Sequence, residues 1–245
     1  MKTRLVFTVA VIFFLCAAHG QDTMPPRKQN IPIENQKFIW FPYPLNAKSR
    51  TSIGITSTTM PNEITEEMHF RIPALDVHVM KKLSGKLDLR ARLLAQVVQN
   101  MLIVGPKWST ELGNRASMSL GNDLSFWFGI INVQNVNTKG YGFQNYPNVS
   151  FGLRFNKQIL LSLRAEQIMT FGVHTKAGNT NVKSDYRLLS GSAYTVAVEQ
   201  PFAGKKSMTL GFRAMYTDYY WQTWTLFENY KRNLFFPQFI VGLIL

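Results

Sequence analysis

Apolar and polar residues alternate along most of this 245-residue chain, and this period-two pattern restricts the fold more than any other feature. In the stretch 208–216, Leu210 and Phe212 fall on one face while Thr209 and Arg213 fall on the other. Because successive side chains of a β-strand point to opposite faces, each such stretch predicts a strand with one apolar and one polar face. The same alternation recurs in 87–97, 115–121, 149–155 and 159–173.

Alternation alone fits a soluble β-sandwich as well as a membrane β-barrel. The apolar faces, however, are long enough for strands of about 9–11 residues, which is the length that crosses a bilayer at a tilt. The polar faces are rich in Gly, Ser, Thr and Arg, which suits a crowded lumen better than a solvated surface. We therefore expect an all-β fold, a transmembrane antiparallel up-and-down β-barrel, with a soluble sandwich as the alternative. Aromatic side chains that would form interfacial girdles are Tyr141, Tyr146, Tyr186, Tyr216, Tyr219, Tyr220, Trp221 and Trp224.

The pattern predicts about ten strands, with eight or twelve as alternatives, and an even number places both ends of the barrel segment on one side. A proline at position 73 makes the second strand irregular. The expected strands are 50–59, 66–82, 86–103, 114–121, 123–134, 148–155, 158–174, 188–199, 206–221 and 233–245.

Two kinds of connection are expected between these strands. Tight turns are predicted at Ser84-Gly85, Gly121-Asn122-Asp123, Asn156-Lys157 and Ala203-Gly204-Lys205. Longer polar loops are predicted at 104–113, 135–147, 175–187 and 222–232. Short turns on one side and long loops on the other are typical of the periplasmic and external faces of a membrane barrel, so we expect 135–147 and 175–187 to face the outside of the cell.

The N-terminal segment predicts export. Lys2 and Arg4 precede the apolar run 5–18, and small residues flank His19, so residues 1–20 have the pattern of a signal peptide. A lipoprotein signal that uses Cys16, the only cysteine, is the alternative. Residues 21–48 would form a periplasmic leader, in which 38–41 could be an extra strand, a plug in the lumen or a belt against the rim. Residues 49–245 would form the barrel.

Together, the signal peptide, the aromatic-rich strands and the hydrophobic final segment 235–245 resemble those of Gram-negative outer-membrane β-barrel proteins. The expected mature start at Gln21 resembles Bacteroidota-type exports. The resemblance implies insertion by the barrel-assembly machinery, an outer-membrane location, and contact with outer-membrane lipid and lipopolysaccharide. The final strand departs from the usual pattern because it lacks a terminal aromatic residue and contains Pro237.

Enzymatic chemistry has little support in the sequence. Asp76-Val77-His78 resembles the Asp-x-His pair of omptin proteases, but the pair lies early in the chain and the sequence contains no Asp-x-Asp. The His-x-Ser pair of barrel lipid A deacylases is also missing. We therefore expect a non-enzymatic protein with no catalytic residues, no cofactor and no metal. An exported barrel would not meet nucleic acid, despite a formal net charge of +13.

Charged residues on the polar faces are the candidate site. An isolated buried charge is very costly, so these residues must pair with each other or with water. A structural ion-pair network and a narrow, anion-favouring, porin-like pore both fit. Asp88 also falls on a polar face, and Asp76 could join it. We expect a structural barrel or narrow pore; the alternative is an accessory subunit of a larger outer-membrane secretion or assembly complex, ahead of a barrel enzyme. The predicted lumen residues are Arg90, Arg92, Arg115, Arg154, Arg164, Glu166, Glu199 and Arg213.

Overall fold

The structure, a computed structural model, describes residues 36–65, 71–133, 136–155, 158–183, 186–203, 206–226 and 232–245. The chain divides into two compact units, Met1–Ile31 and Pro32–Leu245, and the described residues all belong to the second. The expected signal peptide and the first part of the segment 21–48 lie outside the described residues.

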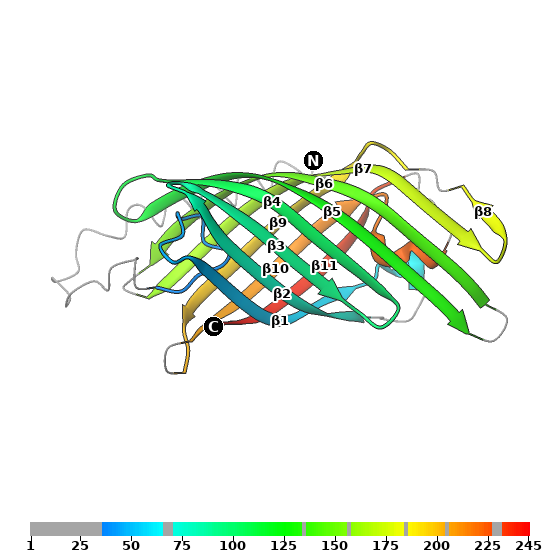
Figure 1. Cartoon of the computed structure of the whole chain (residues 1–245), viewed down its shortest axis with the longest axis horizontal. Helices are drawn as coiled ribbons and strands as arrows, with labels where there is room; N and C mark the ends of the chain where they lie inside the picture. The colour runs from blue at the N-terminus through cyan, green and yellow to red at the C-terminus, as the bar shows by residue number, and fades with distance from the viewer. Residues whose placement is uncertain are drawn as a thin grey trace. The chain divides into compact units, whose positions relative to one another are not determined.

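Ten strands of the described chain close into a barrel in which each strand runs antiparallel to its neighbours (Figure 1). The first strand pairs with the last, with Thr56 opposite Ile240, and this pairing closes the barrel. The ten-stranded antiparallel barrel predicted from the sequence is therefore confirmed. In chain order its strands are β1 Ser49–Thr59, β2 Arg71–Ser84, β3 Leu87–Ala95, β4 Gln99–Glu111, β5 Ala116–Val133, β6 Val136–Phe155, β7 Ile159–Ala177, β9 Leu189–Pro201, β10 Ser207–Thr217 and β11 Leu234–Ile244.

Three short elements lie in the connections between barrel strands. Strand β8, Thr180–Val182, pairs with the end of β7, beyond the part of β7 that pairs with β9. Helix α2, Asn62–Thr65, follows β1, and the 3-10 helix η2, Trp221–Leu226, follows β10. None of the helices in the described residues is long and apolar enough to span a membrane.

Several predicted boundaries are wrong, although the strand number is right. The stretch 86–103 is two strands, β3 and β4, because the chain reverses at 96–98 without a turn residue such as Gly, Pro or Asp. Conversely, 114–121 and 123–134 are one strand, β5, and the expected tight turn at 121–123 lies in its middle.

The loops predicted at 104–113 and 135–147 are also wrong. Residues 104–111 belong to β4, and residues 136–147 belong to β6, which pairs with β5 as far as Val133 opposite Val136. Polar and Gly-rich composition suggested loops, but a cross-strand partner satisfies each backbone amide and carbonyl whatever the side chain. The β5–β6 hairpin therefore continues well beyond its apolar part.

The two ends of the barrel differ. The end at which the chain enters β1 and leaves β11 has short connections, including the β2–β3 turn, where Gly85 adopts a φ of +44°. The other end, called here the far rim, carries three long connections, 60–70, 178–188 and 218–233, and two short ones, 96–98 and 134–135. Strand β11 runs antiparallel to β1. The barrel segment therefore begins and ends on the same side.

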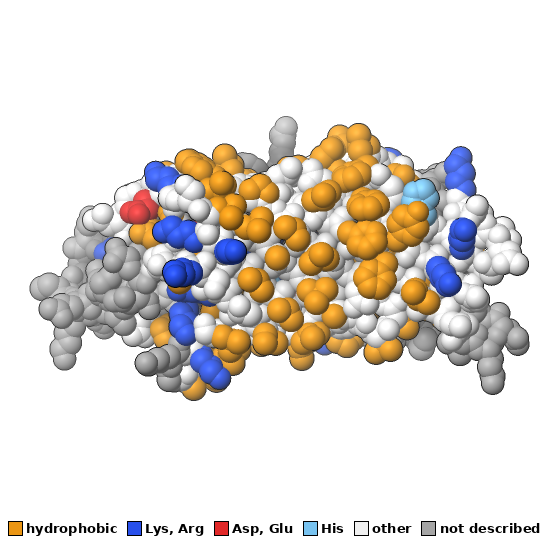
Figure 2. Space-filling view, viewed as in Figure 1, with side chains coloured by type: hydrophobic (Ala, Val, Ile, Leu, Met, Phe, Trp, Pro, Cys, Tyr) orange, Lys and Arg blue, Asp and Glu red, His pale blue; other side chains and the backbone are white. Residues whose placement is uncertain are grey.

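The barrel exterior is apolar. Side chains such as Ile55, Leu124 and Phe212 point outward and are exposed, while their chain neighbours point into the lumen and are buried. Figure 2 shows the outward apolar side chains as a broad band, with basic side chains toward both ends. Exposed apolar surface of this extent is the mark of a surface that contacts lipid or another protein.

Phe212 provides a test of this outward face. It is 37% exposed and packs against Phe239, with ring centroids 5.3 Å apart. Replacing Phe212 by Arg is expected to lower the free energy of unfolding by about 2–4 kcal/mol in a bilayer, because a guanidinium would enter hydrocarbon. Thr209→Ser, on the inward face of the same strand, keeps its hydroxyl and should be nearly neutral. Urea titration of both variants in lipid vesicles measures the difference, and equal tolerance would contradict the assigned faces.

Candidate functional site

The lumen of the barrel is filled in three layers. At the end where β1 begins and β11 ends, an apolar cluster surrounds Phe38 and Phe41. At the far rim, a second apolar cluster contains Trp127, Tyr220 and Trp224. Between these clusters the inward side chains are charged and buried. The buried charged residues are Arg50, Asp76, Asp88, Arg90, Arg92, Lys107, Asp123, Arg164, Glu166, Glu199 and Arg213, together with His78.

A chain of ion pairs crosses the lumen from β3 to β10. Asp123 on β5 accepts hydrogen bonds from Arg90 (2.7 Å) and Arg164 (2.5 Å). Arg164 also donates to Glu166 (2.8 Å), and the other oxygen of Glu166 lies 2.9 Å from Arg213. Two carboxylates thus join three guanidiniums, and each carboxylate contacts two arginines from different strands.

A second cluster lies on β1, β2 and β3. Arg92 donates to both oxygens of Asp76, at 3.0 Å from Nε and 2.7 Å from Nη2. Thr56 donates to the same carboxylate at 2.5 Å, and His78 Nε2 lies 2.9 Å from it. The Asp76–His78 pair considered as a catalytic motif is therefore buried in an ion-pair cluster. Trp40 covers it, with its ring centroid 5.1 Å from that of His78.

The segment 36–48 enters the lumen, and Glu199 on β9 holds it there. The Glu199 carboxylate accepts hydrogen bonds from the backbone amides of Ile39 (2.8 Å), Trp40 (3.0 Å) and Phe41 (2.9 Å). Thr209 donates to the same carboxylate at 3.2 Å. One buried carboxylate therefore satisfies three consecutive amides that have no strand partner, which orients the aromatic side chains on either side of them.

Further contacts fix both ends of this segment. Arg50 donates to the Gln36 carbonyl at 2.7 Å, and Asp88 accepts from the Leu45 amide at 3.2 Å. The Trp40 ring lies under two guanidiniums, 5.5 Å from Arg90 and 5.3 Å from Arg92. Cation–π contacts of this kind are worth about 2 kcal/mol when desolvated. The luminal segment is thus bound to the charged layer as well as to the barrel wall.

At the far rim, η2 folds into the mouth of the barrel. The Trp224 ring lies against Gly129 and Gly140, where a Cβ atom would collide with it, and its Nε1 donates to Gln99 at 2.7 Å. The Tyr220 hydroxyl lies 2.9 Å from that of Thr58 and accepts from Gln238 at 2.8 Å. Burial raises the pKa of Tyr220 to about 12, so its phenol stays protonated and able to donate.

The structure brings six of the eight predicted lumen residues into the interior. Arg115, however, is exposed just before β5, and Arg154 is only half-buried near the end of β6. Both belong to the inward set by alternation, but the barrel ends at their level, so they lie at its mouth rather than in the buried layer. The six interior residues are Arg90, Arg92, Arg164, Glu166, Glu199 and Arg213.

Sequence reasoning missed three members of the buried layer, Arg50, Asp123 and Lys107. Asp123 was assigned to a turn and Lys107 to a loop, yet Asp123 bridges two arginines and Lys107 Nζ lies 3.7 Å from Asp88. A signal for Asp123 was present, because it shares the parity of Ser119 and Ser125 on β5. Only the pairing of β5 with β4 and β6 shows that the strand runs through this position.

Closure of the barrel, its apolar exterior and its filled lumen define the class of protein. The chain is an antiparallel β-barrel of the outer-membrane type. No protein-family model matches the sequence, and the comparison with curated proteins finds no match.

Among solved structures, two Neisserial proteins are similar to this chain. The translocator domain of the autotransporter NalP from Neisseria meningitidis is 9% identical, with 82% of this chain and 89% of that chain covered, at a TM-score of 0.38. Neisserial surface protein A is 8% identical, with 81% and 97% covered, at a TM-score of 0.28. The class follows from the geometry of this barrel, and the resemblance to Bacteroidota-type exports stays a prediction.

Proposed function

We propose that this protein is a closed, non-enzymatic structural barrel of the bacterial outer membrane. The observation that carries the proposal is the filling of the lumen at three successive levels, by the segment 36–48, by the charged layer and by η2. An open pore needs a continuous water-filled path through the lumen. In this barrel, side chains from three separate parts of the chain fill the lumen. The apolar exterior supports the membrane placement.

The charge balance favours a structural network over an anion-favouring pore. Within the described residues, the buried layer holds six basic groups, apart from His78, and five acidic groups, so its excess positive charge is small. Each arginine of the central chain contacts a carboxylate at 2.9 Å or less. Guanidiniums that are already neutralised in this way attract passing anions weakly.

Conductance and fractionation test this function. The full chain is expected to remain with the detergent-extracted outer membrane and to give no steady conductance in a planar bilayer. A stable, anion-selective conductance would replace the structural barrel with the pore. Recovery in the soluble fraction would contradict the membrane placement. Pull-down from gently solubilised membranes tests the alternative of an accessory subunit, which predicts a stoichiometric envelope partner.

We also propose that the far rim faces the outside of the cell, because its connections are the longer ones. An epitope tag inserted at Asn179, in the exposed turn between β7 and β8, should be labelled by antibody on intact cells. A tag inserted at Gly85, in the opposite β2–β3 turn, should be labelled only after the outer membrane is broken. The reverse result would invert the orientation.

A further inference from the structure

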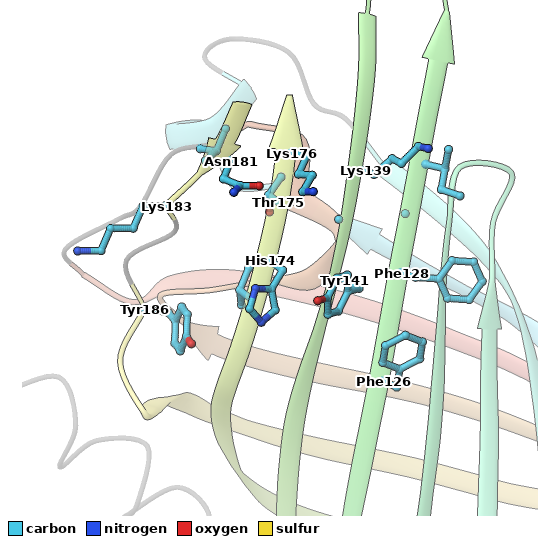
Figure 3. A pocket seen from close by; sticks show the side chains of 15 residues that line it. Phe126, Phe128, Lys139, Tyr141, His174, Thr175, Lys176, Asn181, Lys183 and Tyr186 are labelled. Atoms are coloured by element: carbon cyan, nitrogen blue, oxygen red, sulfur yellow. The ribbon is translucent and has the colours of Figure 1, made fainter. Parts of the chain in front are cut away.

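A groove of about 940 Å³ lies near the far rim, over the ends of β5, β6 and β7 and the added strand β8. Figure 3 shows the arrangement of its side chains. Aromatic rings lie toward the middle of the barrel, and basic side chains lie toward the rim. The residues that matter here are Phe126, Phe128, Lys139, Tyr141, His174 and Lys176.

Lys139 and Lys176 occupy directly opposed positions on β6 and β7, and both are exposed. Like charges at directly opposed positions destabilise a sheet. In the described part of the chain, neither lysine forms a salt bridge with a carboxylate. Asn181 of β8 lies opposite Lys176 and adds an amide to the same row. The row is therefore complementary to an anion that would bridge the two ammonium groups.

The next row toward the barrel centre is aromatic. Tyr141 lies opposite His174, and their rings stack with centroids 4.9 Å apart. Phe126 continues the aromatic surface, 6.0 Å from Phe128 and 5.1 Å from Phe143. These rings belong to the apolar exterior, where hydrocarbon chains would lie. A pair of cations at the rim thus stands directly beside a surface suited to acyl chains.

We propose that this groove binds a phosphorylated lipid of the outer leaflet, with one phosphate between Lys139 and Lys176. Its acyl chains lie along Phe126, Phe128 and Tyr141. The inference rests on the proposed outer-membrane placement and orientation, which put the far rim at the level of the outer headgroups. Bridging by the phosphate removes the repulsion between the lysines, so the lipid also stabilises the β6–β7 pairing.

Binding can be measured on the full chain in detergent, by native mass spectrometry and by thermal unfolding. The probes are a glycolipid that carries two phosphates, the same lipid with its phosphates removed, and inorganic phosphate. The double variant Lys139→Gln/Lys176→Gln should bind the phosphorylated lipid about 10- to 30-fold more weakly, because each lysine contributes about 1 kcal/mol at a lipid surface. Lys81→Gln/Lys206→Gln, which removes the same charge from the opposite rim, should bind like the unaltered chain.

The lipid-free stability gives an independent readout. Without lipid, the single variant Lys176→Gln should unfold at the same or a higher temperature, since it relieves the repulsion with Lys139. With lipid, it should lose about half of the stabilisation that the double variant Lys139→Gln/Lys176→Gln loses. Equal binding of the dephosphorylated lipid would overturn the phosphate site, and displacement of the lipid by millimolar inorganic phosphate would overturn the choice of a lipid. Failure of binding by a chain that still fractionates with the outer membrane and accepts antibody at Asn179 would overturn this inference alone.

Discussion

Replacing Asp123 by Asn should lower the free energy of unfolding by about 3–5 kcal/mol, the range found when one partner of a buried ion pair is removed. Asp123 is 3% exposed and contacts both Arg90 and Arg164. Its loss leaves the chain of ion pairs from β3 to β10 with one carboxylate, Glu166, for three guanidiniums. The change can be measured as a shift in the urea midpoint of heat-modifiable gel migration.

An exposed ion pair provides the matched control. Glu63 pairs with Arg232 at 3.0 Å, but both side chains are largely open to solvent, so Glu63→Gln should cost less than about 1 kcal/mol. Glu166→Gln, which leaves Arg164 and Arg213 undercompensated, should resemble Asp123→Asn. If instead these two variants leave stability unchanged and create an ion preference in bilayers, the layer is hydrated and the structural interpretation is wrong.

Replacing Glu199 by Ala should release the segment 36–48 from the lumen. The change removes the acceptor of three backbone amides, and each unsatisfied buried amide costs about 1–3 kcal/mol. The amides regain partners only in water, so the segment is expected to leave while the β1–β11 pairing keeps the barrel closed. Trypsin should then cut the folded protein after Lys37 and Lys48, whereas the unaltered chain should resist cleavage at Lys37.

Two milder variants separate release of the segment from general instability. Glu199→Gln keeps one carbonyl acceptor and should show intermediate protection. Glu111→Gln weakens the exposed hydrogen bond that the Tyr43 hydroxyl of this segment donates to Glu111 (2.7 Å) and should leave the segment protected. Continued resistance of Glu199→Ala to trypsin would show that the contacts of Trp40 with the arginines hold the segment without the carboxylate.

The alternation of apolar and polar residues was sufficient to predict the two faces of each strand, because facing is a local property of a strand. The barrel followed only when the length of the apolar faces and the composition of the polar faces were added. Residues 159–173 alternate except at Leu160, Gln167 and Ile168, and the observed β7 spans Ile159–Ala177. Boundaries were less accurate where local composition conflicted with pairing. The chain reverses at Val97, which is fully exposed, although the apolar pattern continues through it, and it stays extended at Gly121 and Asn122, which have the composition of a turn.

The sequence by itself determined which side chains face inward, and so identified Arg90, Arg164, Glu166 and Arg213 as candidates for an interior network. Only the tertiary structure decided which of them meet, because partners such as Glu166 and Arg213 lie on different strands, 47 positions apart, and strand register sets their distance. The tertiary structure also decided the role of Glu199, which binds the segment 36–48 inside the closed barrel. A carboxylate on an alternating strand has no local feature that reveals a buried backbone segment as its ligand, because that segment arrives from the other end of the chain.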